Sequence, residues 1–92
     1  RYLAGMPHSP IRVAIVEDDD QLRDLIRKRI ERSGDMQVVR TFRSGDDFLE
    51  GIGKLDAQVV LMDINMPGKN GIECVRAAKT MKPSQNMYTE TL

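Results

Sequence analysis

The sequence predicts an α/β domain built on a parallel sheet. Three apolar runs rich in β-branched residues, at Ile11–Val16, Met36–Phe42 and 57–62, alternate with three segments that have helical periodicity. Strands and helices that alternate in this way form right-handed crossovers between neighbouring parallel strands. A chain of 92 residues is also the size of one small domain, so no second core is expected.

The first expected strand, Ile11–Val16, stops abruptly at the four acids of 17–20. These acids can supply N-capping carboxylates for the amphipathic helix that follows, and Gly34 can end it. The apolar stripe of this helix consists of Leu22, Leu25, Ile26 and Ile30. Its other face carries the basic residues Arg23, Arg27, Lys28 and Arg32, interleaved with Asp24 and Glu31. Because acids and bases alternate at ion-pair spacing, we interpret this face as a solvated surface and not as a nucleic-acid contact.

The rest of the chain repeats the pattern. After the strand at Met36–Phe42, Ser44 can cap a short helix with an apolar side. The run at 57–62 is apolar almost throughout, as in strands covered on both faces, and it is followed by Asp63. A helix with a broad apolar face is expected over 72–81. The predicted order is therefore three strand–helix pairs.

The overall composition excludes several classes of protein. Fourteen basic and fourteen acidic residues cancel, so the chain as a whole has no attraction to nucleic acid or membrane. No apolar run approaches the roughly 20 residues of a membrane span, and no secretion signal is recognisable. The single cysteine, Cys74, is expected to be a small core residue in a reducing compartment. We therefore expect a cytoplasmic domain over 11–92, preceded by an irregular extension over 1–10.

Two of the expected strands end in acid, which indicates a metal site. In an open parallel sheet, ligands bind beyond the carboxyl ends of the strands. If the first and third strands are neighbours, Glu17, Asp18 and Asp63 converge there, and three close carboxylates stay ionised only with a cation. Oxygen ligands of this kind suit Mg²⁺ or Mn²⁺. The expected ligands are Asp18, Asp63 and the backbone carbonyl of Asn65, with Glu17 holding a bound water.

Asp63 is the expected nucleophile of this site. A cation that bridges a carboxylate and an incoming phosphoryl group neutralises charge that otherwise repels the attack. The product, an aspartyl phosphate, is a reactive acyl phosphate and suits a transient signal. The alternative is that the acids of 17–20 only cap a helix and that Asp63 only begins a turn. Capping does not explain acids at the ends of two separate strands.

Two segments resemble the receiver domain of bacterial response regulators. They are VEDD at 16–19, followed by Leu22 and Arg23, and VVLMDINMPG at 59–68, followed by GIE at 71–73. The resemblance covers about 11–83. The motif is most similar to those of receivers that precede LuxR-type helix-turn-helix output domains. It implies a flavodoxin-like (CheY-like) fold, a histidine kinase as phosphodonor and Asp63 as phosphoacceptor. It also implies that Glu17 and Asp18 are the acid pair and that the Asn65 carbonyl binds metal.

The resemblance ends before the last elements of the family. A complete receiver has five strands and five helices, with a Ser or Thr after the fourth strand and a Lys after the fifth. Here 86–90 is a poor buried strand, either Thr89 or Thr91 can be the threonine, and no residue corresponds to the Lys. We expect a receiver truncated at its C-terminus, with one helix face and one sheet edge bare, which favours a dimer or a partner chain. Truncation is the favoured explanation for the missing elements. The alternatives are that a partner chain supplies them or that this is a naturally short receiver.

The leading functional prediction is a phosphoacceptor module of a two-component system that is not itself an enzyme. A histidine kinase phosphorylates Asp63 with Mg²⁺, and the output, expected to be transcription, lies outside this chain. One alternative is a receiver-like interaction module that is not phosphorylated. Another is a Mg²⁺-dependent phosphohydrolase, although such enzymes typically carry a second acid where this chain has Asn65.

Overall fold

The fold is a parallel sheet between helices, as the sequence predicts. The computed structural model describes residues 9–64, 66 and 71–90. In chain order the elements are β1 (Ile11–Val16), α1 (Asp20–Arg32), β2 (Met36–Phe42), α2 (Gly45–Gly51), the short 3-10 helix η1 (Ile52–Lys54), β3 (Val59–Asp63), α3 (Gly71–Met81) and β4 (Asn86–Glu90). Within the described part of the chain the strands run parallel in the order β2-β1-β3-β4. The first and third strands are therefore neighbours, which is the arrangement that the predicted site requires.

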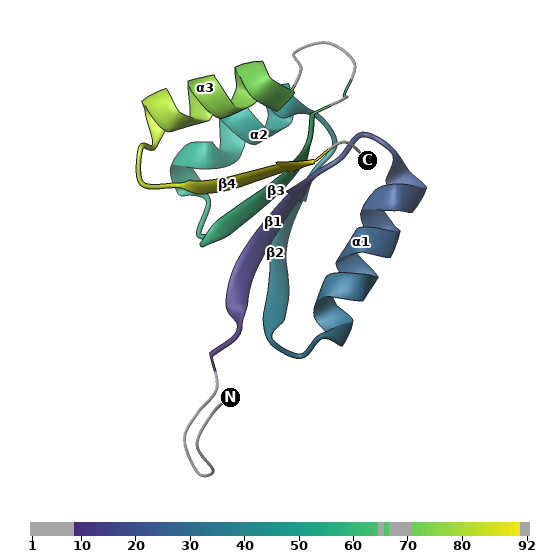
Figure 1. Ribbon diagram of the computed structural model, residues 1–92. Helices are drawn as coiled ribbons and strands as arrows, with labels where there is room; N and C mark the ends of the chain where they lie inside the picture. Colours follow the sequence, from purple (N-terminus) through teal and green to yellow (C-terminus); the bar gives the residue numbers. More distant parts are fainter. Residues whose placement is uncertain (1–8, 65, 67–70, 91–92) are drawn as a thin grey trace.

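The main core lies between the sheet and the two helices α2 and α3, on what we call the closed face (Figure 1). None of its buried residues is more than 9% exposed. They are Ala14, Val16, Phe42, Phe48, Ile52, Leu55, Ala57, Val60, Met62, Met66, Cys74 and Ala78. Cys74 is thus a core residue, as predicted, and apolar burial on this face holds the carboxyl ends of β1 and β3 in place.

On the opposite face, which we call the open face, α1 is the only helix among the described residues (Figure 1). Val13 and Ile15 of β1 point to this side by strand alternation and are 3% and 1% exposed. Farther along the sheet Leu61 is only half-buried, and Tyr88, its partner in β4, is 61% exposed. No residue of α1 is buried, and Leu25 is 60% exposed. Among the described residues, α1 therefore covers the open face over β1 but leaves it exposed over β3 and β4.

The helix signals in the sequence act as predicted. The Asp19 side chain caps α1, since its Oδ1 accepts hydrogen bonds from the backbone N–H groups of Gln21 and Leu22. Ser44 caps α2 by accepting from the N–H of Asp47. After α1, Gly34 adopts a left-handed conformation with φ of 78°, which glycine adopts at little cost. The turns that enter and leave the first helix are thus specified locally.

Two strands differ from the prediction. β3 begins at Val59 and not at 57, because the preceding Gln58 bonds to Arg12 at the start of β1 through both its backbone and its side chain. It also includes Asp63, which was expected to follow the strand. The segment Asn86–Glu90, judged a poor buried strand, does form β4. It pairs with β3 as an exposed edge, and its polar residues suit that position.

Some sequence predictions fall on residues that the structure does not describe. They concern Asn65, Thr91, the loop at 67–70 and residues 1–8 of the N-terminal extension. Ser9 and Pro10 have no regular secondary structure. In the part of the chain that the structure covers, no helix has the length and apolar character that crossing a membrane requires. The cytoplasmic location stays a prediction.

Candidate cation and phosphoacceptor site

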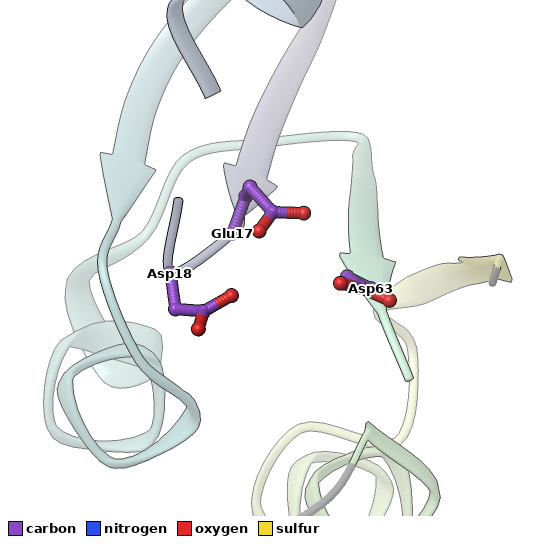
Figure 2. Close-up of side chains that lie close together, drawn as sticks. All are labelled: Glu17, Asp18 and Asp63. Atoms are coloured by element: carbon purple, nitrogen blue, oxygen red, sulfur yellow. The ribbon is translucent and has the colours of Figure 1, made fainter. Parts of the chain in front are cut away.

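Three carboxylates meet where β1 and β3 end. Val16 and Met62 are paired in register, so Glu17 and Asp63 follow them side by side on neighbouring strands. Asp18 comes next, in the turn toward α1. Figure 2 shows the three side chains directed into one space, Glu17 and Asp18 from the β1 side and Asp63 from the end of β3. Parallel strands end at the same edge of a sheet, which explains why acids 45 or more positions apart come together.

The cluster is compact and largely shielded from water. Glu17, Asp18 and Asp63 each offer a carboxylate oxygen, and these oxygens lie within 4.8 Å of one another. Glu17 is 1% exposed and Asp63 5% exposed, whereas Asp18 is exposed. The site therefore has two buried walls and one open side, through which an ion or a phosphoryl group can enter.

Glu17 is the most perturbed acid of the cluster. Its Oε2 accepts a hydrogen bond of 3.0 Å from the Asp19 N–H, but its buried Oε1 has no hydrogen-bond partner among the described residues. Burial raises the pKa of Glu17 from 4.5 to about 7, and the nearby carboxylates of Asp18 and Asp63 add to this effect, while the bond from Asp19 opposes it. A buried acid with an unsatisfied oxygen beside two other acids is destabilising unless a cation or a proton is bound.

The cluster fits a small divalent cation. Two oxygens on opposite sides of one Mg²⁺ are about 4.2 Å apart, since each Mg–O distance is about 2.1 Å. The observed 4.8 Å spread of the three oxygens is close to that span. All three donors are hard carboxylate oxygens, which match Mg²⁺ or Mn²⁺ and not a thiol-seeking metal. The unsatisfied Oε1 of Glu17 can serve as a ligand of a bound ion or as a hydrogen-bond acceptor for its water.

Gly71 allows α3 to begin close to this site. Its N–H donates to the Ile64 carbonyl at 3.2 Å, immediately after Asp63. A β-carbon at position 71 would lie 2.5 Å from the Ile64 Cα and 3.0 Å from the Asp63 carbonyl oxygen. Any larger residue would therefore push the start of α3 away from the end of β3. The glycine that the sequence analysis included in the receiver-like motif thus has a steric role beside the proposed phosphoacceptor.

Two further polar residues, Thr89 and Lys82, have different positions relative to the acid cluster. Thr89 is an exposed residue of β4 paired with Met62, one position before Asp63. Lys82 donates from its Nζ to the Leu55 carbonyl at 2.7 Å, a contact that joins the end of α3 to the segment before β3. Lys82 therefore has a structural contact and is not part of the acid cluster.

Arg23 is a residue whose role the sequence analysis missed. It was assigned to the solvated ion-pair face of α1, and Arg27 does bond there to Asp24 and Glu31. Arg23 instead turns back toward the site, and its Nη1 donates to the backbone carbonyl of Glu17 at 2.9 Å. A basic residue in the first turn of the helix, six positions after Glu17, was the available signal. Spacing alone could not distinguish this contact from a surface ion pair.

Comparisons with known proteins agree with the geometry. A family model described as response regulator receiver domain matches residues 13–91. The chain is 33% identical over 73 residues to a protein-glutamate methylesterase/protein-glutamine glutaminase of Methanococcoides burtonii, which covers 79% of this chain and 21% of that protein. It is 31% identical over 74 residues to the transcriptional regulatory protein LnrK of Bacillus subtilis, covering 80% of this chain and 34% of the regulator.

Solved structures show the same fold. A LuxR-family two-component response regulator from Aurantimonas superimposes with a TM-score of 0.84 at 25% identity, over 90% of this chain and 59% of that one. The isolated receiver domain of RcsB from Salmonella enterica, studied with the phosphomimetic BeF3-, gives a TM-score of 0.80 at 29% identity, over 90% and 62%. The chain spans about a fifth of the length of the first methylesterase relatives. Together with the convergent acids at the end of a parallel sheet, these matches establish that the chain belongs to the receiver domain family of two-component response regulators.

Proposed function

We propose that Asp63 accepts a phosphoryl group from a histidine kinase, with Mg²⁺ held at the acid cluster. The observation that supports this function best is the convergence of Glu17, Asp18 and Asp63 within 4.8 Å at the ends of two neighbouring strands. The N-cap of α1 is the Asp19 side chain, so helix capping does not account for the convergence of the other three acids.

The proposed reaction is a direct transfer between two side chains. A carboxylate oxygen of Asp63 forms a P–O bond while the P–N bond of a phosphohistidine breaks. The electron pair of the P–N bond returns to the imidazole nitrogen, which takes up a proton from solvent. The exposed side of the cluster, next to Asp18, admits the donor, and burial of Asp63 limits access of water to the acyl phosphate.

The acids divide the work of binding in this proposal. Asp18, Asp63 and the backbone carbonyl of Asn65 would be the protein ligands of the cation, and the unsatisfied Oε1 of Glu17 would hold a water. When bound, Mg²⁺ neutralises charge between Asp63 and the incoming phosphoryl oxygens. Ionised Glu17 is needed for this arrangement, so cation binding and release of its proton are linked.

The output lies in a part of the protein beyond the receiver fold. Relatives combine similar domains with different activities, since some are methylesterases and LnrK is a transcriptional regulator. RcsB was solved bound to promoter DNA, and this chain corresponds to 43% of that protein. We propose transcription as the output because the LuxR-family regulator and RcsB are both close structural neighbours. The receiver itself then contacts a kinase and an output domain or partner chain.

Beryllofluoride, an acyl-phosphate mimic, tests the phosphoacceptor directly. Fluorine NMR of the wild-type chain with Mg²⁺ and beryllofluoride is expected to show bound signals, and Asp63→Asn is expected to abolish them. Asp56→Asn is the matched control, because Asp56 is an exposed aspartate that precedes β3, whereas Asp63 ends it. This control is expected to bind beryllofluoride like the wild type.

Two results would contradict the proposal. Absence of bound beryllofluoride in the wild type, or binding that Asp63→Asn leaves unchanged, would favour a receiver-like interaction module that is not phosphorylated. Continuous release of phosphate from small phosphomonoesters would instead favour the phosphohydrolase. A labile phosphoryl group that appears on the chain after incubation with acetyl phosphate, and that Asp63→Asn removes, supports the proposed function.

A further inference from the structure

Arg23 differs from the other basic residues of α1 in where its side chain goes. It is 16% exposed, whereas Arg27, one turn later, is 39% exposed. Its Nη1 donates to the Glu17 carbonyl at 2.9 Å, and its Nη2 forms a short ion pair with Asp20. The guanidinium therefore links the first turn of α1 to the backbone of Glu17, directly before Asp18. It does not belong to the solvated ion-pair face.

This contact acts on the peptide that joins the two acids of the β1 side. The Glu17 carbonyl belongs to the peptide unit between Glu17 and Asp18, so holding it limits rotation of the backbone that carries Asp18. The Glu17 N–H is already bonded to the Phe42 carbonyl at 3.1 Å, and the Glu17 carboxylate to the Asp19 N–H. With Arg23 in place, the backbone of Glu17 is held on both sides and its carboxylate is held separately.

Charge alone predicts the opposite effect on a cation. A fixed positive charge beside the acids of 17–20 repels a divalent ion, so Arg23 as a simple charge would weaken binding. Arginine's planar fork of donors, in contrast, can hold a carbonyl and a carboxylate at once in a defined geometry. Residues that orient metal ligands in this way typically change metal affinity by 10- to 100-fold when they are replaced. The two effects have opposite signs and can be separated.

We propose that Arg23 is a positioning residue of the cation site, which holds the Glu17–Asp18 peptide so that both carboxylates face Asp63. This inference rests on the proposed cation binding. It assigns to α1 a role in the site in addition to covering the sheet, because the first turn of the helix then determines the geometry of the acids. Arg23 is expected to favour cation binding despite its positive charge.

The test is the Mg²⁺ affinity of matched arginine variants, measured by calorimetry at neutral pH. Arg23→Gln removes both the charge and the fork, and Arg23→Lys keeps the charge but can replace only one of the two contacts. Both are expected to weaken Mg²⁺ binding by about 10- to 100-fold. Arg27→Gln makes the same change of charge on the same helix. Among the described residues the Arg27 side chain bonds to Asp24 and Glu31, so this variant is expected to change affinity by less than about threefold.

A second readout separates positioning from loss of the fold. Thermal unfolding checks that each variant is folded at the temperature of the titration, and Arg23→Lys carries the test if Arg23→Gln does not fold. The carbonyl carbon chemical shift of Glu17 reports the lost hydrogen bond directly. It is expected to move most in Arg23→Gln, which cannot replace the charged donor, and to stay unchanged in Arg27→Gln.

The outcomes distinguish this inference from the function on which it rests. If the wild type binds neither Mg²⁺ nor beryllofluoride, both proposals fail. If the wild type binds both, and Arg23→Gln binds Mg²⁺ as tightly or more tightly, only the role of Arg23 fails. Wild-type affinity in Arg23→Lys also overturns it, because the fork is then not required. Weakened binding in both Arg23 variants, with Arg27→Gln unchanged, supports it.

Discussion

The two faces of the sheet are buried to very different degrees. On the closed face, residues from β1, β3, α2 and α3 form a continuous cluster in which Phe48, Val60 and Met62 are fully buried. On the open face, α1 has no buried residue, and Leu25 and Tyr88 are each about 60% exposed. The same strands thus contribute to a finished core on one side and to a partly covered surface on the other.

This difference separates the source of stability from the location of function. Burial of apolar side chains on the closed face supplies most of the favourable free energy of folding. The acid cluster at the carboxyl ends of β1 and β3 opposes folding, because it places Glu17 and Asp63 in a nearly dry environment. The free energy of unfolding of a domain of this size is only about 5 to 14 kcal/mol, so the site depends on the closed face to remain assembled.

The largest expected effect is from a cavity in the closed face. Phe48 is fully buried, and its ring packs edge-on against Phe42 with centroids 5.5 Å apart. Phe48→Ala is expected to reduce the free energy of unfolding by about 3 to 5 kcal/mol, through lost burial and the cavity that remains. Urea unfolding followed by circular dichroism measures this change. Phe48→Leu, which keeps most of the volume, is expected to cost less, and a loss below about 1 kcal/mol for Phe48→Ala would contradict the comparison.

A smaller change in the free energy of unfolding, of opposite sign, is expected when an acid of the cluster is replaced. Because the pKa of Glu17 is raised from 4.5 to about 7, the folded protein keeps a proton that the unfolded chain releases between these values. Without a divalent cation, stability should therefore fall as pH rises through this range. Glu17→Gln does not titrate, so above pH 7 it should be more stable than the wild type by up to about 3 kcal/mol, with little difference near pH 4.5.

Chemical unfolding at several pH values, in the presence of a chelator, measures this difference. Asp56→Asn serves as the control, because Asp56 is exposed and lies at the other end of β3. Mg²⁺ is expected to remove the advantage of Glu17→Gln at high pH, since an ion that binds the folded wild type stabilises it by mass action. Equal pH dependence in the wild type and Glu17→Gln would show that Glu17 does not oppose folding.

Much of this fold follows from local patterns that tertiary contacts did not override. The strands β1 and β2 have the predicted bounds, because each is a β-branched run between strong turn signals. The strand β4 was harder to predict, since Asn86–Glu90 is polar and becomes a strand only through pairing with β3 along an exposed edge. An edge strand needs less apolar sequence than a buried one, and periodicity does not identify its partner.

Those parts of the site that depend on where a residue stands relative to a strand were predictable from the sequence. Glu17, Asp18 and Asp63 follow or end strands, so their convergence required only the correct order of β1 and β3. The contact of Arg23 was not predictable in this way, because an arginine in a first helical turn can reach either a helix neighbour or the preceding loop. The raised pKa of Glu17 likewise depends on burial of one particular oxygen.

The smallest expected effect is on the open face. Leu25 is 60% exposed, and glutamine has a similar helix propensity, so Leu25→Gln should change the free energy of unfolding by no more than about 0.5 kcal/mol. Urea unfolding at two protein concentrations measures it, with Phe48→Ala as the reference for a buried site. A loss above about 1 kcal/mol would mean that Leu25 is covered in solution. If that loss also grew with protein concentration, the cover would be a second copy of the chain, and the contrast between the two faces would hold only for the isolated protomer.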